Sequence, residues 1–456
     1  MNITLIHGII IALTVAIVIG AGLCQARSIH SSSAYSVGGR SAGPLLVAGS
    51  IAGTVVGGGA TVGTAQLAYM SGLSAWWFTL GSGIAFIIMG IFYAKKMRST
   101  ALETIPQFLS LHYGKRAEEL SSVISSLGIL FSAVASCLPG IEIISALTGL
   151  SPSLSALLLV VLVAGYTFFG GMKSAGISGI LKMAIIWFAL FIAGIEAWQG
   201  LRVTGSFDTM APSSLSLFGR GMELSLANLF SVIVGVLCTQ TYIQCIFSAR
   251  TPVVASIGCF VAALIVIPVG LPSVAVGMFM AVFDPQALPI LVLPNYLINH
   301  TTTLVGSLGM GGIVLSLISS IGGLSLGIGT MISRDMISPL FKMKDDRKIL
   351  LMTRMTVLSV MALACMISLA NRGSQVLHWN YLSMALRGGG IFLPFSLAVF
   401  CPGHLSRKWA VISMAGSTAA SLISPLLSIP LDPLFVGLIT SAILIIPGWR
   451  RKGVSH

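Results

Sequence analysis

The sequence predicts an all-α polytopic membrane protein, and two observations carry that prediction. Hydrophobic residues make up 55% of the 456-residue chain and charged residues only 8%, whereas soluble domains carry about 25% charged residues. The apolar stretches are continuous and about 20 residues long, the length of a helix that crosses a bilayer, rather than the alternating segments of roughly 10 residues typical of membrane barrels. Because lipid offers no hydrogen-bond partner to the backbone, these stretches are expected to be helical.

Thirteen apolar stretches are predicted to span the bilayer. Glycine and proline punctuate several of their ends, as at Gly170-Gly171 and Pro402-Gly403. The predicted spans are 4–24, 44–70, 72–94, 121–148, 154–170, 176–199, 226–247, 254–282, 303–332, 350–370, 381–401, 408–426 and 433–449.

The lysine and arginine residues predict how these spans are oriented. If the N-terminus lies outside, 21 of the 25 Lys and Arg residues fall in inner loops or at inner helix ends. Cytoplasmic loops carry such an excess, so we predict a multi-pass protein of the plasma membrane, the inner membrane in a bacterium, with its C-terminus in the cytoplasm. The same bias accounts for the net charge of +13, and no nucleic-acid partner is expected.

The second span contains three consecutive glycines, Gly57 to Gly59. Glycine is a poor helix former, and transporters built from inverted repeats break helices near the midplane, where freed carbonyls bind a cation and half-helix ends face the substrate. Close packing of helices through small residues is the alternative interpretation. The seventh span holds a polar cluster from Thr239 to Gln244, which is costly in lipid unless it faces a cavity or partners.

These two interruptions predict a single membrane transport domain with an internal repeat. The interrupted spans would be the first helices of two inverted five-helix units, and corresponding interruptions point to a binding site between them. The expected parts are an extra N-terminal helix and loop at 1–43, the two repeats at 44–200 and 226–401, and two C-terminal helices at 404–456.

Motifs along nearly the whole chain resemble one family, the sodium/solute symporters. The most specific motif is Ser316-Leu317-Ile318-Ser319-Ser320, with Asp335 at the end of the helix. The resemblance implies a leucine-transporter-type fold with broken helices. It also implies sodium-coupled symport of a small organic solute into the cell by alternating access. The other matching motifs are Tyr35 to Ser41, Gly57 to Gly63, Tyr69 to Leu73, Thr104 to Phe108, Tyr113-Gly114 and Tyr166 with Gly170-Gly171.

The resemblance also implies a sodium site between the second and ninth spans. Backbone carbonyls would come from Gly53, Val56 and Ser316, and hydroxyls from Ser319 and Ser320. Sodium is a hard cation that prefers oxygen ligands, by the logic that governs calcium and magnesium. The alternative is that the two serines bond back to carbonyls of their own helix.

The chain departs from the family pattern near this site. Gly179 stands where sodium-coupled members often carry an aspartate, and Lys182 follows a few residues later. Lys182 could replace the charge of the ion as a proton-linked switch, or it could snorkel to the inner interface, since it lies only about 9 Å into its span. Gly322 and Gly323 occupy the positions that would supply hydroxyls to a second sodium site, so at most one coupling ion is expected.

Two charged residues, Glu142 and Arg387, lie about 9 Å inside the outer ends of their spans. They could form an ion pair across an outer vestibule, Arg387 could hold a substrate carboxylate, or it could snorkel to the surface. The residues predicted to bind substrate are Gly57, Gly59, Gln66, Tyr69, Glu142, Gln240, Gln244 and Arg387.

Sodium-coupled symport is therefore the leading prediction, with the solute unidentified. The alternative is a proton-coupled or uncoupled transporter of the same fold that uses Lys182 or Glu142. A membrane sensor or an enzyme has less support, because the sequence has no HExxH, GxSxG or metal-cluster motif. No segment outside the spans exceeds about 30 residues, too few to bury a core of its own. The expected partners are the solute, a sodium ion and the lipid bilayer, and the chain is expected to work as a monomer.

Overall fold

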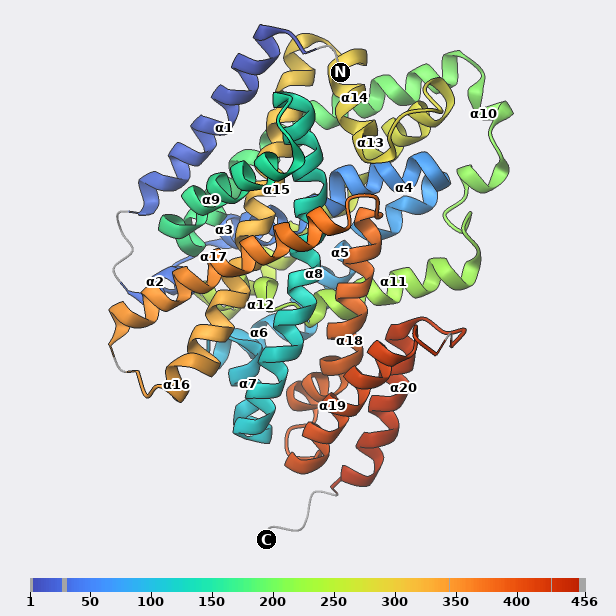
Figure 1. The fold of residues 1–456 in the computed structure, drawn as a ribbon. Helices are drawn as coiled ribbons and strands as arrows, with labels where there is room; N and C mark the ends of the chain where they lie inside the picture. Colours follow the sequence, from blue (N-terminus) through green and yellow to red (C-terminus); the bar gives the residue numbers. More distant parts are fainter. Residues whose placement is uncertain (1–2, 27–30, 344, 428, 451–456) are drawn as a thin grey trace.

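A computed structural model describes residues 3–26, 31–343, 345–427 and 429–450 of the chain. Within these ranges the regular structure is helical, and the only strand-like pairings are isolated bridges, Ala42 with Ala249 and Leu405 with Trp449. Helices from distant parts of the sequence cross one another throughout the molecule (Figure 1). The all-α prediction is confirmed.

The helices of the first half begin with α1 (Leu5–Ala26), α2 (Ser32–Val37), η1 (Gly38–Arg40), α3 (Pro44–Val55), η2 (Gly59–Gly63), α4 (Thr64–Ser71), η3 (Gly72–Trp76), α5 (Trp77–Ile88), η4 (Met89–Tyr93) and α6 (Ala94–Ser99). They continue with α7 (Ile105–Tyr113), α8 (Lys115–Thr148), α9 (Pro152–Val203), α10 (Ser206–Thr209) and η5 (Pro212–Leu215).

The helices of the second half are α11 (Met222–Leu237), α12 (Gln240–Ser248), α13 (Pro252–Phe283), η6 (Pro289–Leu291), α14 (Val292–His300), α15 (Thr303–Met331), η7 (Ile332–Ile337) and α16 (Ser338–Leu340). The last are α17 (Asp346–Ala370), α18 (Val376–Phe400), α19 (Arg407–Ile423), α20 (Pro433–Ile445) and η8 (Ile446–Gly448).

Each of the thirteen predicted stretches coincides with helical backbone. Among the described residues, seven helices are long and apolar enough to cross a membrane, and eight if a bent pair counts as one span. The chain is therefore a multi-pass membrane protein. That it crosses the membrane thirteen times stays a prediction. The break between the fifth and sixth predicted spans lies in the long helix α9, where Gly171 has φ +54° and kinks the helix.

Both predicted helix interruptions are present. Helix α3 ends at Val55, and the backbone at Val56 leaves the helical region with φ −79° and ψ 75°. The chain resumes as the wide turn η2 and then α4. At the second interruption, α11 and α12 meet at an angle of 43° across Cys238 and Thr239.

The glycine run at the first interruption also serves close packing, so the two interpretations of it are compatible. A Cβ atom at Gly57 would lie 2.3 Å from the Ser320 hydroxyl, and one at Gly59 would lie 2.5 Å from the amide nitrogen of Asn380. Glycine thus lets the interrupted segment touch α15 on one side and α18 on the other.

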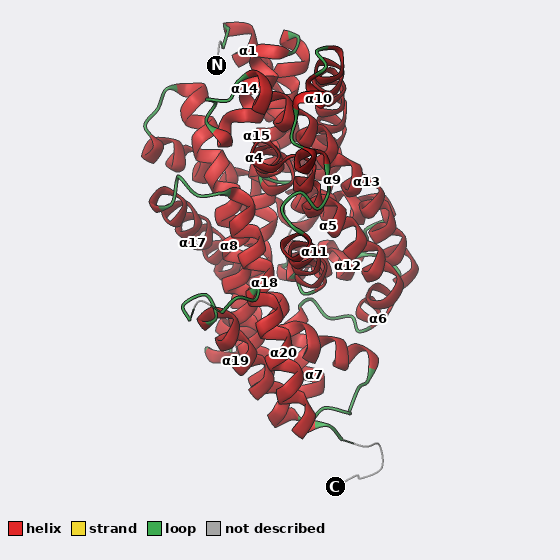
Figure 2. Ribbon diagram, turned by 90° about the vertical axis from the view of Figure 1, so that its right-hand side faces the viewer, coloured by secondary structure: helices red, strands yellow, loops and turns green. Residues whose placement is uncertain are grey.

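Helix α15 forms the centre of the molecule. It packs against α9, α8, α1 and α3, and every residue from Met310 to Met331 is buried. Helix α18 packs against α8, α11 and α20, and α19 and α20 lie together with α7 at the end near the C-terminus (Figure 2). The two interrupted segments therefore lie against α15 and α18.

Candidate functional site

The predicted sodium ligands surround the side-chain nitrogen of Lys182. Its Nζ donates to the backbone carbonyls of Gly53, Val56 (3.0 Å) and Ser316 (3.4 Å), and to the hydroxyl of Ser319. We call these four oxygens the cation cage. The structure therefore brings together four of the five predicted ligand residues, and places an ammonium among them.

The fifth residue, Ser320, faces a neighbouring carbonyl. Its hydroxyl donates to the backbone oxygen of Thr54 at 2.7 Å. The Ser319 hydroxyl also reaches α3, at 3.2 Å from the Gly53 oxygen, and lies 3.4 Å from the Ser316 carbonyl of its own helix. The serine pair thus bonds mainly across to α3, and bonding within its own helix is secondary.

The interruption of α3 explains why carbonyls are free at this point. The last carbonyls of a helix have no partner within it, and they form the negative end of the helix dipole. Gly53 and Val56 lie at this end of α3, and the Ser316 hydroxyl donates to the Val56 oxygen. The local sequence therefore builds a position that favours a positive charge.

Lys182 reaches the cage because α3 and α9 touch through glycine. A Cβ atom at Gly179 would lie 2.1 Å from the backbone oxygen of Gly49, and one at Gly53 would lie 2.9 Å from the Cα atom of Gly179. Lys182 follows Gly179 by three residues, on the same face of α9, and its side chain is fully buried. The interpretation of Lys182 as a residue that snorkels to the interface is therefore wrong.

Arg387 is a second buried cation, at the second interruption. Its Nη1 donates to the hydroxyl of Thr239 at 2.7 Å, and Nη2 to the hydroxyls of Ser383 (2.9 Å) and Ser132 (3.3 Å). Its Nε donates to the Ser383 carbonyl at 3.1 Å. Only 1% of the residue is exposed, and in the described part of the chain no carboxylate pairs with it.

The predicted pair between Glu142 and Arg387 is wrong. Glu142 pairs instead with Arg372, at 2.6 Å between Nε and Oε1, and the arginine side chain is 44% exposed. Arg387 does not reach the surface, so the snorkelling interpretation is also wrong for it. Depth within a span predicted a functional role for both residues, but it could not predict which neighbour each side chain contacts.

The glutamines and the tyrosine predicted to bind substrate form hydrogen bonds with backbone groups of neighbouring segments. Gln240 accepts from the Ile105 amide (2.8 Å) and donates to the Glu103 carbonyl (2.9 Å). The other contacts are Gln244 with the Ser36 carbonyl (2.7 Å) and the Thr330 hydroxyl (3.1 Å), Gln66 with the Val376 amide (3.0 Å), and Tyr69 with the Asp284 carbonyl (3.1 Å).

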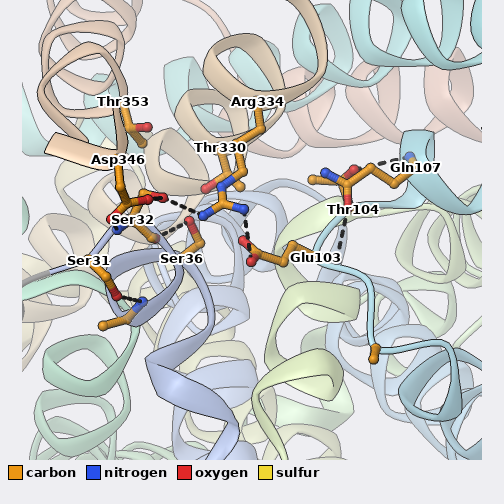
Figure 3. A network of polar contacts seen from close by, with 12 residues as sticks. Ser31, Ser32, Ser36, Glu103, Thr104, Gln107, Thr330, Arg334, Asp346 and Thr353 are labelled. Atoms are coloured by element: carbon orange, nitrogen blue, oxygen red, sulfur yellow. Dashed lines mark hydrogen bonds and ion pairs between the residues drawn. The ribbon is translucent and has the colours of Figure 1, made fainter. Parts of the chain in front are cut away.

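A polar network that the sequence did not predict ties four segments together near Arg334. Arg334 pairs with Glu103 at 2.9 Å and donates to the Ser32 hydroxyl at 2.5 Å. Ser32 in turn donates its amide to Asp346 at 2.8 Å. Figure 3 shows these side chains converging from α2, the loop before α7, η7 and α17. We call this set the Arg334 network.

Asp335, the next residue, anchors the same region. It accepts from the Thr104 hydroxyl at 2.8 Å and from the Gln107 amide at 2.9 Å, and its carbonyl accepts from Lys115 at 3.0 Å. Thr104, Gln107 and Asp335 belong to motifs quoted for the family resemblance. Those motifs were the signal that could have pointed to this region.

A cavity of about 160 Å³ lies beside the first half of α18. It runs beside α11 and α18 and is lined by Arg220, Asn228, Tyr381 and Asp432, among others. Ala385, two residues before Arg387 on α18, also contributes to its wall. Arg387 itself is not among the residues that line the cavity.

The comparisons with known proteins agree with this architecture. The high-affinity choline transporter 1 of Torpedo marmorata is 25% identical over 353 residues, 72% of this chain and 60% of that protein. The sodium/proline symporter of Staphylococcus aureus is 26% identical over 416 residues, covering 86% of this chain and 80% of the relative. This chain therefore spans about 60% of the length of the choline transporters that it matches.

Solved structures show the same fold. A sodium-coupled sialic acid symporter in a substrate-bound, outward-open state aligns with a TM-score of 0.83 at 16% identity, covering 98% of this chain and 97% of the other. A nucleobase–cation symporter aligns with a TM-score of 0.54 at 13% identity, covering 91% and 93% of the two chains. The prediction of a leucine-transporter-type architecture is thereby confirmed at the level of the fold.

A family model extends these similarities over most of the sequence. It matches residues 35–416, which include α3, the cation cage, Arg387 and all of the Arg334 network except Ser32. Members of this family are transporters rather than enzymes, and sodium is the coupling ion of the family, as predicted. This chain belongs to the sodium:solute symporter family.

Proposed function

We propose that this chain is a secondary transporter that carries a small organic solute with a carboxylate group across the membrane by alternating access. The observation that carries the proposal is the buried guanidinium of Arg387 at the interruption between α11 and α12. Hydroxyls and one carbonyl satisfy its described hydrogen bonds, but neutral partners leave its charge uncompensated. A buried charge is costly unless it is paired.

A carboxylate is the natural partner for this group. The planar fork of arginine binds carboxylates through two parallel hydrogen bonds. The solute would lie between the two helix interruptions, near Gly57, Gly59 and Thr239, and would arrive through the cavity beside α18. Proline in the relative from Staphylococcus aureus carries a carboxylate, which makes this solute class compatible with the family.

The Arg334 network supports alternating access because it closes one side of the molecule. It joins α2, η7 and α17 to the loop before α7, and the cavity lies beside α11 and the first half of α18. In this proposal the network faces the cytoplasm, the N-terminus lies outside, and residues 44–200 and 226–401 move as inverted repeats within one monomer in the bilayer.

The test is a solute screen on the purified full chain in lipid nanodiscs. Thermal unfolding would be followed against a library of carboxylates, amines and sugars, in potassium and in sodium buffers. Carboxylates are expected to raise the melting temperature, and the same compounds are expected to enter proteoliposomes that contain the protein. A screen in which only amines or sugars bind would contradict the proposed solute class.

The Arg387→Gln variant then tests the binding role. Loss of a charge-assisted hydrogen bond is worth about 1.5–3 kcal/mol, so its affinity for the solute is expected to fall about tenfold or more. Arg387→Lys should retain part of the affinity because it keeps the charge but loses the fork. The exposed Arg372→Gln is the matched control and should bind normally. Unchanged affinity in Arg387→Gln would overturn the assignment.

A further inference from the structure

Lys182 occupies the position at which the sequence resemblance placed sodium. Three of the four oxygens of the cation cage are backbone carbonyls, at the end of α3 and on α15, and the fourth is a side-chain hydroxyl on α15. All four lie within hydrogen-bond distance of the Nζ atom of Lys182. The amine comes from a third helix, α9. The ligand set that the sequence resemblance implied for a sodium ion is therefore directed here at a group of the protein itself.

The cage is suited to a cation whichever species fills it. Gly53 and Val56 present carbonyls at the end of α3, where the helix dipole is negative. Ser316 and Ser319 complete the shell from α15. An ammonium has three donors and no acceptor, so it matches a shell that consists of acceptor oxygens.

Among the described residues, Lys182 has no charged partner. Its side chain is fully buried, and in the part of the chain that the structure describes no carboxylate forms an ion pair with it. The cage oxygens therefore supply the stabilisation that a buried ammonium requires. A sodium ion would need the same oxygens, and two cations about one hydrogen-bond length apart repel each other strongly in a buried site.

We propose that the ammonium of Lys182 is a built-in cation that replaces a bound sodium ion in the cation cage. Solute binding then requires no sodium at this position. The inference rests on the proposed function, since it concerns how that transport is coupled. The tie that an ion would make between α3 and α15 is made instead by a side chain anchored on α9, and it persists whatever the sodium concentration.

Sodium itself, without solute, is the probe that tests this. The melting temperature of the full chain in nanodiscs would be measured as potassium is replaced by sodium at constant ionic strength. The wild-type protein should show no saturable sodium-specific shift. Lys182→Ala empties the cage, so sodium should now raise the melting temperature by about 2 °C or more. Lys182→Met fills the same space without charge and should gain no sodium response.

Two further variants locate the ion. In the Lys182→Ala background, Ser319→Ala removes one cage oxygen and should abolish the gained response. If Lys182→Ala cannot be obtained folded, Lys182→Ser serves in its place. A wild-type sodium response that Ser319→Ala abolishes would overturn the proposal, as would a Lys182→Ala protein that does not respond to sodium. Because no solute is present, failure here is distinct from failure of the solute screen.

Discussion

Lys182 and Gly179 depend on each other at the scale of single residues. Lys182 can enter the cation cage only because the backbone of α9 approaches α3 at Gly179, where a side chain would collide with the Gly49 carbonyl. Backbone atoms cannot move aside as a flexible side chain can. The absence of a side chain at residue 179 is therefore a condition for the presence of the ammonium at the cage.

Gly179→Ala is expected to destabilise the protein by about 1–3 kcal/mol, the usual range for overpacking a well-packed interior. Gly165→Ala is the matched control on the same helix, since a Cβ atom there has no atom within 4 Å. The control should be neutral or stabilised by up to about 1 kcal/mol. Thermal unfolding of both variants is the measurement, and equal melting temperatures would contradict the close α3–α9 contact.

At the scale of elements, the Arg334 network joins segments that are far apart in sequence. Ser32 and Asp346, for example, are separated by 314 positions, and Glu103 approaches Arg334 from the loop between α6 and α7. Such a network can open only if these segments separate. Its charges should therefore influence how often this side of the protein is closed.

The pKa of Glu103 gives a pH dependence with a definite sign. Burial raises this pKa above its ordinary value of 4.5, and the charges of Arg334 and Arg40 oppose part of the rise while Asp346 adds to it. A carboxyl whose pKa is raised in the closed state binds its proton more tightly there, so protonation favours closure. This advantage is fully present below pH 4.5 and is lost as pH rises through the raised pKa.

Spin labels would be placed at two exposed positions, Ser99 at the end of α6 and Lys348 on α17 near Asp346. The distance between them, measured by electron–electron double resonance, would report closure. The short-distance population should fall as pH rises, and Glu103→Gln should remove most of that dependence. Glu119→Gln, at an exposed position on α8, should behave like the wild type. A short-distance population that rises with pH would show that the assigned sign is wrong.

At the scale of the whole molecule, the proposed orientation rests on the uneven distribution of Lys and Arg. The bias toward one set of loops is an energetic signal read during insertion. It predicts that alkaline phosphatase fused after Met210 is exported and active, whereas the same enzyme fused after Asp345 stays inside and inactive. Activity after Asp345 would contradict the orientation.

Composition and local punctuation predicted much of the fold. Apolar length located the helices, Gly57 to Gly59 located the interruption of α3, and Thr239 lies in the bend between α11 and α12. These features depend on nearby residues, which is why the sequence reveals them. The number of membrane crossings stays open because several of the helices are short.

The site was predictable only in part. The family motifs identified Gly53, Val56, Ser316 and Ser319, which the structure gathers around one point. Depth along a span could not predict that Lys182 turns inward to that point, or that Glu142 pairs with Arg372. Both outcomes depend on which face of a helix meets which neighbour, and that is decided by packing between distant segments.

The most direct measurement of the central claim is a cryo-electron microscopy map of the full chain in sodium buffer, at a resolution that shows side chains and ions. The account predicts continuous density for Lys182 that ends among the oxygens of Gly53, Val56, Ser316 and Ser319, with no separate ion between them. An isolated peak bound by those oxygens, with the Lys182 side chain directed elsewhere, would contradict it.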